Sequence, residues 1–502
     1  MFLILAAGLL FSCSRRTARQ PEEKILAKIG DRTLSVNEFI RRAEYTIRPP
    51  YCRSDNYIHR KIVLNSLIAE KLLALEAGAD NPLTQNEEFQ DFLEGRKEQA
   101  MRQWLFAHDF YQKVKLDTHR VKQVYKLAGR TYRIAYFSVK TPIAANVVRD
   151  KLKTGEPFKQ VFRDFGGLKK LPRRQVKWTD PENKAIEQAL FSAPLKKNQI
   201  VGPLKVGDNF FTTIEVLGWT DEAAVSNSQI QQRWKDVTDR LREREALNSY
   251  RQFAARLMHG KRVVFNQKTF QALVKIYLPI YLKSNKEKKQ TFNQLFWEKK
   301  SPEKVLSNRS GEQIVRILNE PLLRLNNATW TVARFLKEAR RHPPVFRKRH
   351  MSGREFPEQF KLAIVDLIQD KFVAQAAEKK GYDKVNLVKR NVAMWRDNLL
   401  ALYGRNKFLD SIGKKDAFYK DQSKILQNDL NPYIRKLQRK YAGQIEINTD
   451  AFEKIHLTRI DMMVLQKNVP FPVVVPGFPI LTTLNKLDYG RKMTSAAAGS
   501  GK

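Results

Sequence analysis

The sequence has few of the residues that build metal or cofactor sites, and it is short of acidic side chains. Its two cysteines, Cys13 and Cys52, and its seven histidines show neither an HExxH motif nor another paired-ligand spacing. Neither GxxxxGK[ST] nor GxGxxG occurs, so no pattern indicates a bound nucleotide. We therefore expect no metal and no cofactor. With so few cysteines, the chain must be held together by apolar cores rather than by disulfides.

The shortage of acids makes the chain strongly basic. Lys and Arg number 92 against 52 Asp and Glu, which gives a formal net charge of +40. The excess favours contact with anionic surfaces, such as anionic lipid or polysaccharide. Simple solubility is the alternative explanation. Nucleic acid is the other obvious anionic partner, but no recognition motif supports it and the N-terminus indicates export, so we expect no nucleic acid partner.

Residues 1–12 form an apolar run that is too short to span a bilayer and is typical of a signal peptide. The run LFSC resembles a bacterial lipobox, which implies that Cys13 becomes the lipidated first residue of the mature protein. Residues 13–24 would then be a polar tether. An ordinary secretory signal cut nearby is the alternative. We expect a lipoprotein of the cell envelope that faces the periplasm, anchored in the outer membrane in preference to the inner one.

Residues 25–125 are predicted to form a helical segment that opens with two short strands around a turn at Gly30 and Asp31. Ser35, followed three residues later by Glu38, is the pattern of a capping box, so we expect a helix to begin there. Apolar residues at helical spacing predict a second helix in HRKIVLNSLIAEKLLALEAGA, which begins at His59. A third helix is expected from about residue 86 to residue 115.

Residues 131–219 combine strand and helix patterns. The run TYRIAYFSVKTP at 131–142 is rich in β-branched and aromatic residues and predicts a strand. Three helical runs follow, the second marked by Phe158, Val161, Phe162 and Phe165 at helical spacing. Two further strands are expected around a turn at residues 207–208. The predicted order βα3β2 fits one α+β domain.

The same stretch resembles the parvulin-type peptidyl-prolyl isomerase (PpiC, or rotamase) domain, through VKTPIAANVVRDKLKTGEPF, the strand at Trp178, ALFSAPLKKNQIVGPLKV and NFFTTIEVLGW. The resemblance implies a site with two facing histidines, and those positions hold Tyr136 and Thr212, our candidate catalytic residues. It implies that Ile186, Phe191 and Trp178 contact the bound proline. Because both histidines are replaced, two interpretations stay open: an isomerase with weak or lost activity, or a domain that only holds peptides.

The flanking segments resemble the chaperone part of the SurA- and PrsA-type envelope foldases, through AKIGDRTLSVNEF and SLIAEKLLALEAGA. In those families the segment after the isomerase domain closes the same module. We therefore expect residues 226–283 to form a long helix at 227–259, then a strand and a helix. The resemblance implies that the strand KRVVFN at 261–266 pairs with ILAKIG at 25–30.

An internal repeat extends this interpretation. Five residues of the first copy recur at an offset of 300: Leu67, Ile68, Lys71, Ala74 and Ala77 correspond to Leu367, Ile368, Lys371, Ala374 and Ala377. Stretches upstream and downstream match in the same order. Residues 284–492 are thus expected to be a second chaperone module without the isomerase insertion. We expect its Pro-rich last part to lie extended on the body, and residues 493–502 to be disordered.

The expected fold class is therefore mainly α with an α+β insertion, made of two SurA-N-like helical modules, the first carrying a parvulin-like βα3β2 domain. The expected function is that of an envelope foldase or chaperone whose partners are unfolded or newly exported proteins and, through the lipid anchor, a membrane. The alternative is a non-catalytic structural lipoprotein of a secretion or surface-assembly complex, which uses the modules as protein-binding surfaces.

Overall fold

A computed structural model describes residues 23–180, 182–207, 209–282, 308–348, 351–458, 462 and 471–493. These residues are mainly helical and form three small sheets that are antiparallel apart from one short pairing, which agrees with a mainly α chain that carries an α+β part. The chain divides into two compact units. Unit 1 contains the described residues up to Gln103 and from Gly260 onward, and unit 2 is Trp104–His259.

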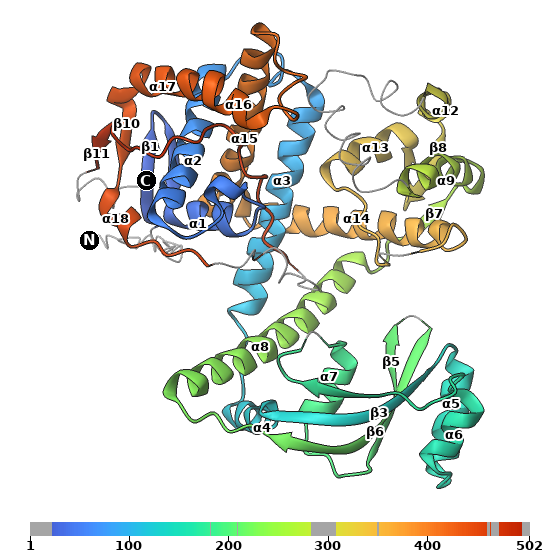
Figure 1. Ribbon diagram of the computed structural model, residues 1–502. Helices are drawn as coiled ribbons and strands as arrows, with labels where there is room; N and C mark the ends of the chain where they lie inside the picture. The colour runs from blue at the N-terminus through green and yellow to red at the C-terminus, as the bar shows by residue number, and fades with distance from the viewer. Residues whose placement is uncertain are drawn as a thin grey trace, which may run out of the picture. The chain divides into compact units, whose positions relative to one another are not determined.

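The first part of unit 1 follows the expected order of a hairpin and helices (Figure 1). Ser35 caps the first helix by accepting a hydrogen bond from the backbone N–H of Glu38, as predicted. The Glu38 carboxylate does not complete a capping box, because it accepts a hydrogen bond from Lys71 instead. The elements are β1 (Ile25–Ile29), β2 (Arg32–Ser35), α1 (Val36–Glu44), the short helix η1 (Pro50–Cys52), α2 (Tyr57–Ala77) and α3 (Glu87–Leu105).

The rest of unit 1 begins with β7 and α9, and after residue 307 it repeats the order of a hairpin followed by helices. Thr331 caps its first helix as Ser35 caps α1. The helices and strands are β7 (Val263–Phe265), α9 (Gln267–Leu282), α12 (Asn308–Ile317), β8 (Pro321–Leu325), β9 (Ala328–Thr331), α13 (Val332–Arg341), α14 (Phe356–Lys379), η3 (Tyr382–Lys384), α15 (Asn386–Ser411), α16 (Gln422–Ile425), η4 (Leu426–Leu430), α17 (Asn431–Lys440), η5 (Ala442–Gln444), β10 (Ile445–Ile447), α18 (Thr449–Glu453) and β11 (Arg491–Lys492).

The two copies exchange their closing strands, so the predicted pairing of KRVVFN with ILAKIG is wrong. Strand β7 pairs with β8, with Val264 opposite Arg324. Strand β1 pairs instead with β10, with Ala27 opposite Ile447. Figure 1 shows the orange β10 beside the blue β1. Both hairpins offer an equivalent edge and both closing strands are short and apolar, so strand patterning alone does not distinguish the two pairings.

The long helices are exchanged in the same way. Helix α15 of the second copy packs along α2 of the first, where Asp397 pairs with Lys71 at 3.0 Å. Helix α3 of the first copy packs against the second, where Asp91 pairs with Arg341 at 2.8 Å and Gly95 lies against the Arg341 carbonyl. Unit 1 therefore has two halves, the first built on the hairpin β1–β2 and the second on the hairpin β8–β9, and each half contains segments of both copies.

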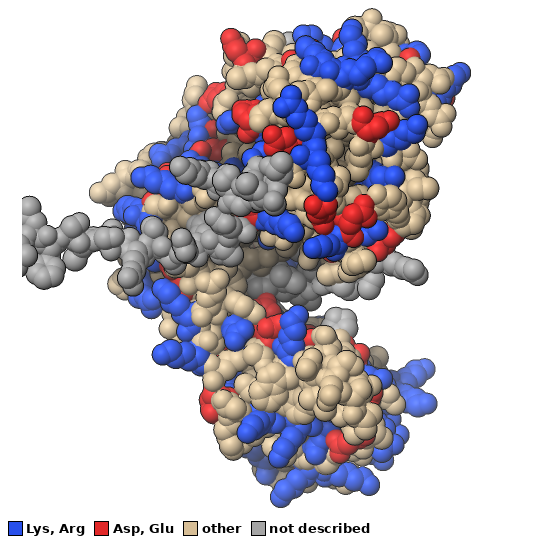
Figure 2. Space-filling view, turned by 90° about the vertical axis from the view of Figure 1, so that its left-hand side faces the viewer, with Lys and Arg blue, Asp and Glu red and all other residues tan. Residues whose placement is uncertain are grey.

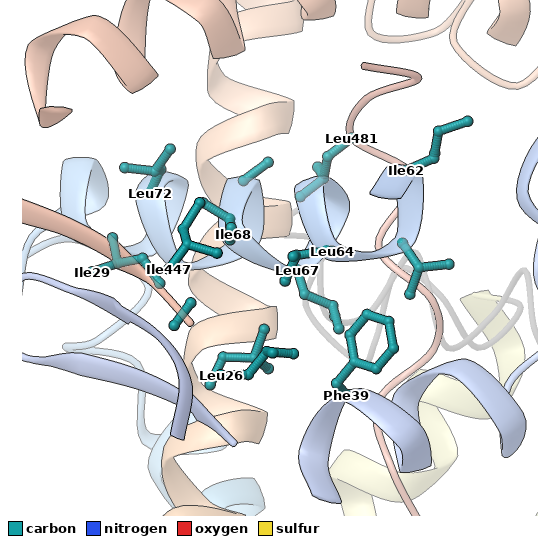
Figure 3. Close-up of a cluster of buried hydrophobic side chains, with 14 of the residues drawn as sticks. Leu26, Ile29, Phe39, Ile62, Leu64, Leu67, Ile68, Leu72, Ile447 and Leu481 are labelled. Carbon is teal, nitrogen blue, oxygen red and sulfur yellow. The ribbon is translucent and has the colours of Figure 1, made fainter. Parts of the chain in front are cut away.

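The core of the first half shows the same exchange (Figure 3). Its buried side chains include Phe39, Leu67 and Ile68 from the first copy together with Ile447 from β10 and Leu481 from the C-terminal segment. The stretch from residue 471 is extended on the body, as predicted, and the Asn65 side chain donates hydrogen bonds to the carbonyls of Leu484 and Lys486. Of residues 493–502, expected to be disordered, Met493 is ordered instead: it is buried, and its backbone N–H donates to the Ile447 carbonyl at 2.9 Å. Residues 494–502 lie outside the described residues.

Unit 2 contains a four-stranded sheet in the order β4-β3-β6-β5. The predicted β5–β6 hairpin and the long helix α8 are confirmed, but the order has one strand more than βα3β2. The additional strand, β4, lies directly before Trp178, where the family resemblance implies a strand. Apolar alternation did not predict it, because only Val176 is buried among polar residues. The elements are η2 (Phe106–Tyr111), α4 (Thr118–Ala128), β3 (Arg130–Val139), α5 (Pro142–Lys153), α6 (Phe158–Phe165), β4 (Arg173–Lys177), α7 (Lys184–Phe191), β5 (Ile200–Gly207), β6 (Phe210–Asp221) and α8 (Asn227–Met258).

Engineered disulfides test the strand exchange. Ala27→Cys combined with Ile447→Cys is expected to form a cross-link under mild oxidation, because the two residues are direct partners on antiparallel strands. The matched pair Ala27→Cys with Val264→Cys represents the unexchanged arrangement and should stay reduced. Peptide mapping by mass spectrometry identifies the linked residues. A cross-link in the second pair and none in the first would overturn the exchange.

Two helical glycines test the packing of the exchanged helices. A Cβ atom on Gly95 of α3 would lie 2.1 Å from the carbonyl oxygen of Arg341, whereas one on Gly404 of α15 would come no closer than 3.4 Å to Leu73. Gly404→Ala should stabilise the protein by up to about 1 kcal/mol through helix propensity. Gly95→Ala should destabilise it by about 1–3 kcal/mol, because the helices must separate. Urea unfolding midpoints measure both, and equal stabilisation by both substitutions would contradict this packing.

Candidate functional site

The two central strands of unit 2 bring Tyr136 and Thr212 onto one face of the sheet. Tyr136 on β3 lies opposite Ile214 on β6, and Ser138 lies opposite Thr212. Because paired residues of antiparallel strands point to the same side, Tyr136, Ser138 and Thr212 share a face. This is the face of the apolar cluster that contains Ile214, and Tyr136 is partly buried at its margin.

A pair of hydroxyl groups occupies the centre of this site. The Oγ of Ser138 and the Oγ1 of Thr212 are 2.8 Å apart, within hydrogen-bond distance, and Thr212 is 4% exposed. The sequence analysis missed Ser138. Strand alternation could have identified it, because residues 136 and 138 of one strand face the same side. The two hydroxyls can donate to and accept from a peptide group, and neither is a strong base.

A cation lies over the phenol ring of Tyr136. The guanidinium carbon of Arg174 is 5.3 Å from the ring centroid, and the guanidinium also pairs with the carboxylate of Glu182. Arg174 comes from β4, where it lies opposite Ile134 of β3. The resemblance implied a strand near Trp178 but not its register against β3, which sets the position of Arg174. The result is a fixed positive charge at the margin of the site, held by a partner carboxylate.

The three residues expected to contact proline are core residues. Ile186, Phe191 and Trp178 are 5%, 1% and 5% exposed, and the ring of Phe191 packs edge-on against that of Trp178 at 5.4 Å. They belong to the same apolar cluster as Ile214, so they lie on the same side of the sheet as Tyr136 and Thr212. In this structure they fill the interior and present no open apolar surface to a ligand.

The helices that precede and follow the domain in sequence, α4 and α8, explain why Ile186, Phe191 and Trp178 are buried. Val124 of α4 and Leu241 of α8 are buried in the same cluster as Trp178. Arg240 of α8 lies over the Trp178 ring at 4.7 Å and pairs with Glu187 of α7 at 3.1 Å. Burial raises the pKa of the Glu187 carboxyl, against the opposing effect of Arg240. The two helices therefore cover much of the sheet face on which the candidate site lies.

No imidazole contributes to this sheet. The histidines of unit 2 are His108, His119 and His259, and none lies on a strand. Within the described residues, no three His, Cys, Asp or Glu side chains approach one another closely enough to hold a metal ion. The groups that remain are a phenol, two hydroxyls and a guanidinium. They can donate hydrogen bonds to a peptide carbonyl.

A hollow with aromatic walls lies in unit 1. It has a volume of 440 Å³ and is formed between α2, α15 and the start of α17. Tyr403, Phe408 and Tyr433 line it, and the rings of Phe408 and Tyr433 are stacked with centroids 4.0 Å apart. Glu76 and Lys407 supply charges at its wall. The hollow exists because α15 packs on the other copy's α2, so the sequence did not predict it.

The cysteines show no reactive site among the described residues. Cys52 is fully buried, and burial raises the pKa of its thiol to about 12, so it is a structural residue. Cys13, the expected lipidation site, lies outside the described residues. Among the described helices, none has the length and apolar content needed to cross a bilayer.

Substitutions separate the core from the site. Phe191→Ala is expected to destabilise the protein by about 3–5 kcal/mol, because it empties a packed aromatic position. Tyr136→Phe should change stability by less than about 0.5 kcal/mol, since it keeps the ring under Arg174. Urea unfolding followed by circular dichroism measures both. If Phe191→Ala left stability unchanged, its ring would be a surface residue open to a ligand.

Comparison with known proteins gave no relative: neither a scan against protein-family models nor a search of curated proteins found a match.

Proposed function

We propose that this chain is a cell-envelope foldase or chaperone of the parvulin type, with prolyl isomerase activity that is weak or lost. The observation that carries the proposal is the pair of central strands in unit 2, where Tyr136 and the Ser138–Thr212 pair share one face of an α+β sheet. Tyr136 and Thr212 are the positions at which the family resemblance places its two histidines. In sequence, the domain lies within the first of two repeated helical copies, although β7, which follows it, pairs with the second copy's hairpin.

The chemistry explains why activity can survive without imidazoles. Rotation about a peptide bond to proline has a barrier of roughly 18–20 kcal/mol, and no covalent bond is made or broken. A site accelerates it by binding the twisted amide, in which the conjugation is lost. Hydroxyls such as those of Ser138 and Thr212 can hydrogen-bond that state, but the buried Phe191 leaves little apolar surface for the proline ring. We therefore expect a small acceleration or none.

Binding of extended client segments is the stronger part of the proposal. The hollow in unit 1 combines three half-buried aromatic side chains with a charged wall, which suits an apolar or aromatic side chain of an unfolded protein. Its residues come from both copies, so it is a product of the exchange. Clients would be unfolded or newly exported proteins in the periplasm, with the chain anchored through Cys13, preferably in the outer membrane.

The burial of the expected proline contacts favours one second candidate. A domain whose ligand face is covered by α4 and α8 can serve as a fixed contact surface. The alternative function is thus a non-catalytic structural lipoprotein of a secretion or surface-assembly complex. It differs from the first proposal in one respect: it requires no affinity for unfolded proteins.

One experiment with two measurements tests these functions on the protein from Ser14 onward. Exchange NMR of a proline-containing tetrapeptide measures isomerisation for the wild type, Tyr136→Phe and Thr212→Val. Aggregation of an unfolded outer-membrane-type protein measures holding for the wild type and Tyr403→Ala. We expect little or no isomerisation, suppressed aggregation, and a several-fold weaker suppression by Tyr403→Ala. Tyr419→Ala, at an exposed tyrosine of unit 1 outside the hollow, is the matched control and should stay close to wild type.

The outcomes separate the candidates. Acceleration that falls in Thr212→Val would mean a working isomerase and would refute the expectation of weak or lost activity. Failure to suppress aggregation, together with no isomerisation, would refute both foldase and chaperone activity and leave the structural role. Suppression that Tyr403→Ala does not weaken would show that clients bind elsewhere.

A further inference from the structure

A basic hollow in unit 2 stands apart from the site on the sheet. It has a volume of 670 Å³ and lies between α6 and the segment that leads into β4. No carboxylate lines it. Its walls are five cations and three apolar residues: Lys159, Arg163, Lys169, Lys170 and Arg173, with Phe162, Leu171 and Pro172. We call this set the basic hollow.

The cations of the basic hollow are not neutralised. Within the described part of the chain, none of the five has a carboxylate within 4.0 Å, whereas neighbouring cations do. Lys151 pairs with Glu156 at 2.8 Å, and Arg174 pairs with Glu182. Five like charges around one concavity repel each other, and the concave shape concentrates their field. The charge is therefore available to an anionic ligand.

An exposed apolar residue lies directly beside these charges. Leu168 is 59% exposed, between Gly167 and Lys169. Gly167, with a φ of 65°, turns the chain out of α6 in a conformation that favours glycine. The loop therefore presents a leucine that is followed directly by two lysines, Lys169 and Lys170. This combination suits the boundary of a bilayer, where the apolar side chain enters the acyl region and the ammonium groups meet phosphates.

Other anionic partners fit less well. Single-stranded nucleic acid is bound by exposed aromatic rings on which bases stack, and the only aromatic side chain of the basic hollow, Phe162, is 5% exposed. The general excess of positive charge does not explain the hollow either. On the face drawn in Figure 2, Lys and Arg side chains lie among uncharged and acidic ones, whereas the residues that line the basic hollow include no carboxylate.

We propose that the basic hollow and Leu168 bind the surface of an anionic membrane, with the five cations on lipid phosphates and Leu168 inserted at the interface. The inference does not rest on the peptide-handling function proposed above. It gives unit 2 a contact with the bilayer in addition to the expected N-terminal anchor. Because the contact is electrostatic, it should weaken as salt is raised.

Lysine footprinting on the full chain tests the proposal. The protein is reconstituted with phosphatidylcholine vesicles or with vesicles that also contain phosphatidylglycerol, and acetylation of each lysine is measured by mass spectrometry. Lys159, Lys169 and Lys170 should be protected on the anionic vesicles only. Lys196, Lys197 and Lys205, exposed lysines of the same unit outside the hollow, are the matched controls and should react equally on both.

Two variants use Lys159 as the reporter. Lys169→Gln with Lys170→Gln should weaken its protection about fivefold for each charge removed. Leu168→Ser should weaken it with no change in charge. Equal protection of the control lysines, or no protection of Lys159, would overturn the proposal in favour of a generally basic surface. Protection by inorganic phosphate on phosphatidylcholine vesicles, unaffected by Leu168→Ser, would overturn it in favour of a soluble anion.

Discussion

The buried charge network between α2 and α15 is the interaction on which unit 1 depends. Arg42 and Glu70 are fully buried and joined by two hydrogen bonds of 2.8 and 2.7 Å, and Asn398 of the second copy donates to the same carboxylate at 2.6 Å. The residue before Asn398, Asp397, accepts hydrogen bonds from both Lys71 and Arg32. Burial lowers the pKa of Lys71, but the nearby carboxylates of Glu38 and Asp397 outweigh that effect and raise it. Removing one partner of a buried ion pair costs about 3–5 kcal/mol. Within the first copy Lys71 also pairs with Glu38, so α15 adds a second carboxylate to Lys71 and a further hydrogen bond to Glu70.

The second copy shows how the exchange is specified. At the position equivalent to Arg42 it has Glu338, which pairs with Lys371, and Asp91 of α3 pairs with Arg340 and Arg341. The copies thus share their apolar pattern, but the sign of the charge differs at the positions of Arg42 and Glu338. If α3 entered the first half, Asp91 would meet Glu44, at the position equivalent to Arg340, and such like-charge contacts select between similar partners. The two elements that flank unit 2 in sequence therefore lie in the same half of unit 1. Helix α3 pairs with Arg341, and strand β7 pairs with β8 of the second copy's hairpin.

Sequence patterns predicted those features whose cause is local. The cap at Ser35, the apolar spacing of α2 and the β5–β6 hairpin all depend on neighbouring residues, and the repeat is visible in the residues themselves. The pairing of β1 failed because two strands of similar pattern compete for one edge, and the choice is made by residues such as Asp397, far along the chain. The site was predicted in part. Tyr136 and Thr212 share a face, but Arg174 and the burial of Phe191 depend on β4, α4 and α8, whose contacts no local pattern reveals.

The alternation of β3 separates the two proposed activities of unit 2. Tyr136 faces the cluster covered by α4, α7 and α8, whereas the next residue, Phe137, faces the opposite side and packs on Phe162 of α6 with ring centroids 5.9 Å apart. Phe162 lies at the wall of the basic hollow. A peptide at the hydroxyl pair and a membrane at the basic hollow would therefore contact opposite faces of one sheet and would not compete for space. Substitutions on one face leave the other's contacts in place, so each activity can be lost without the other.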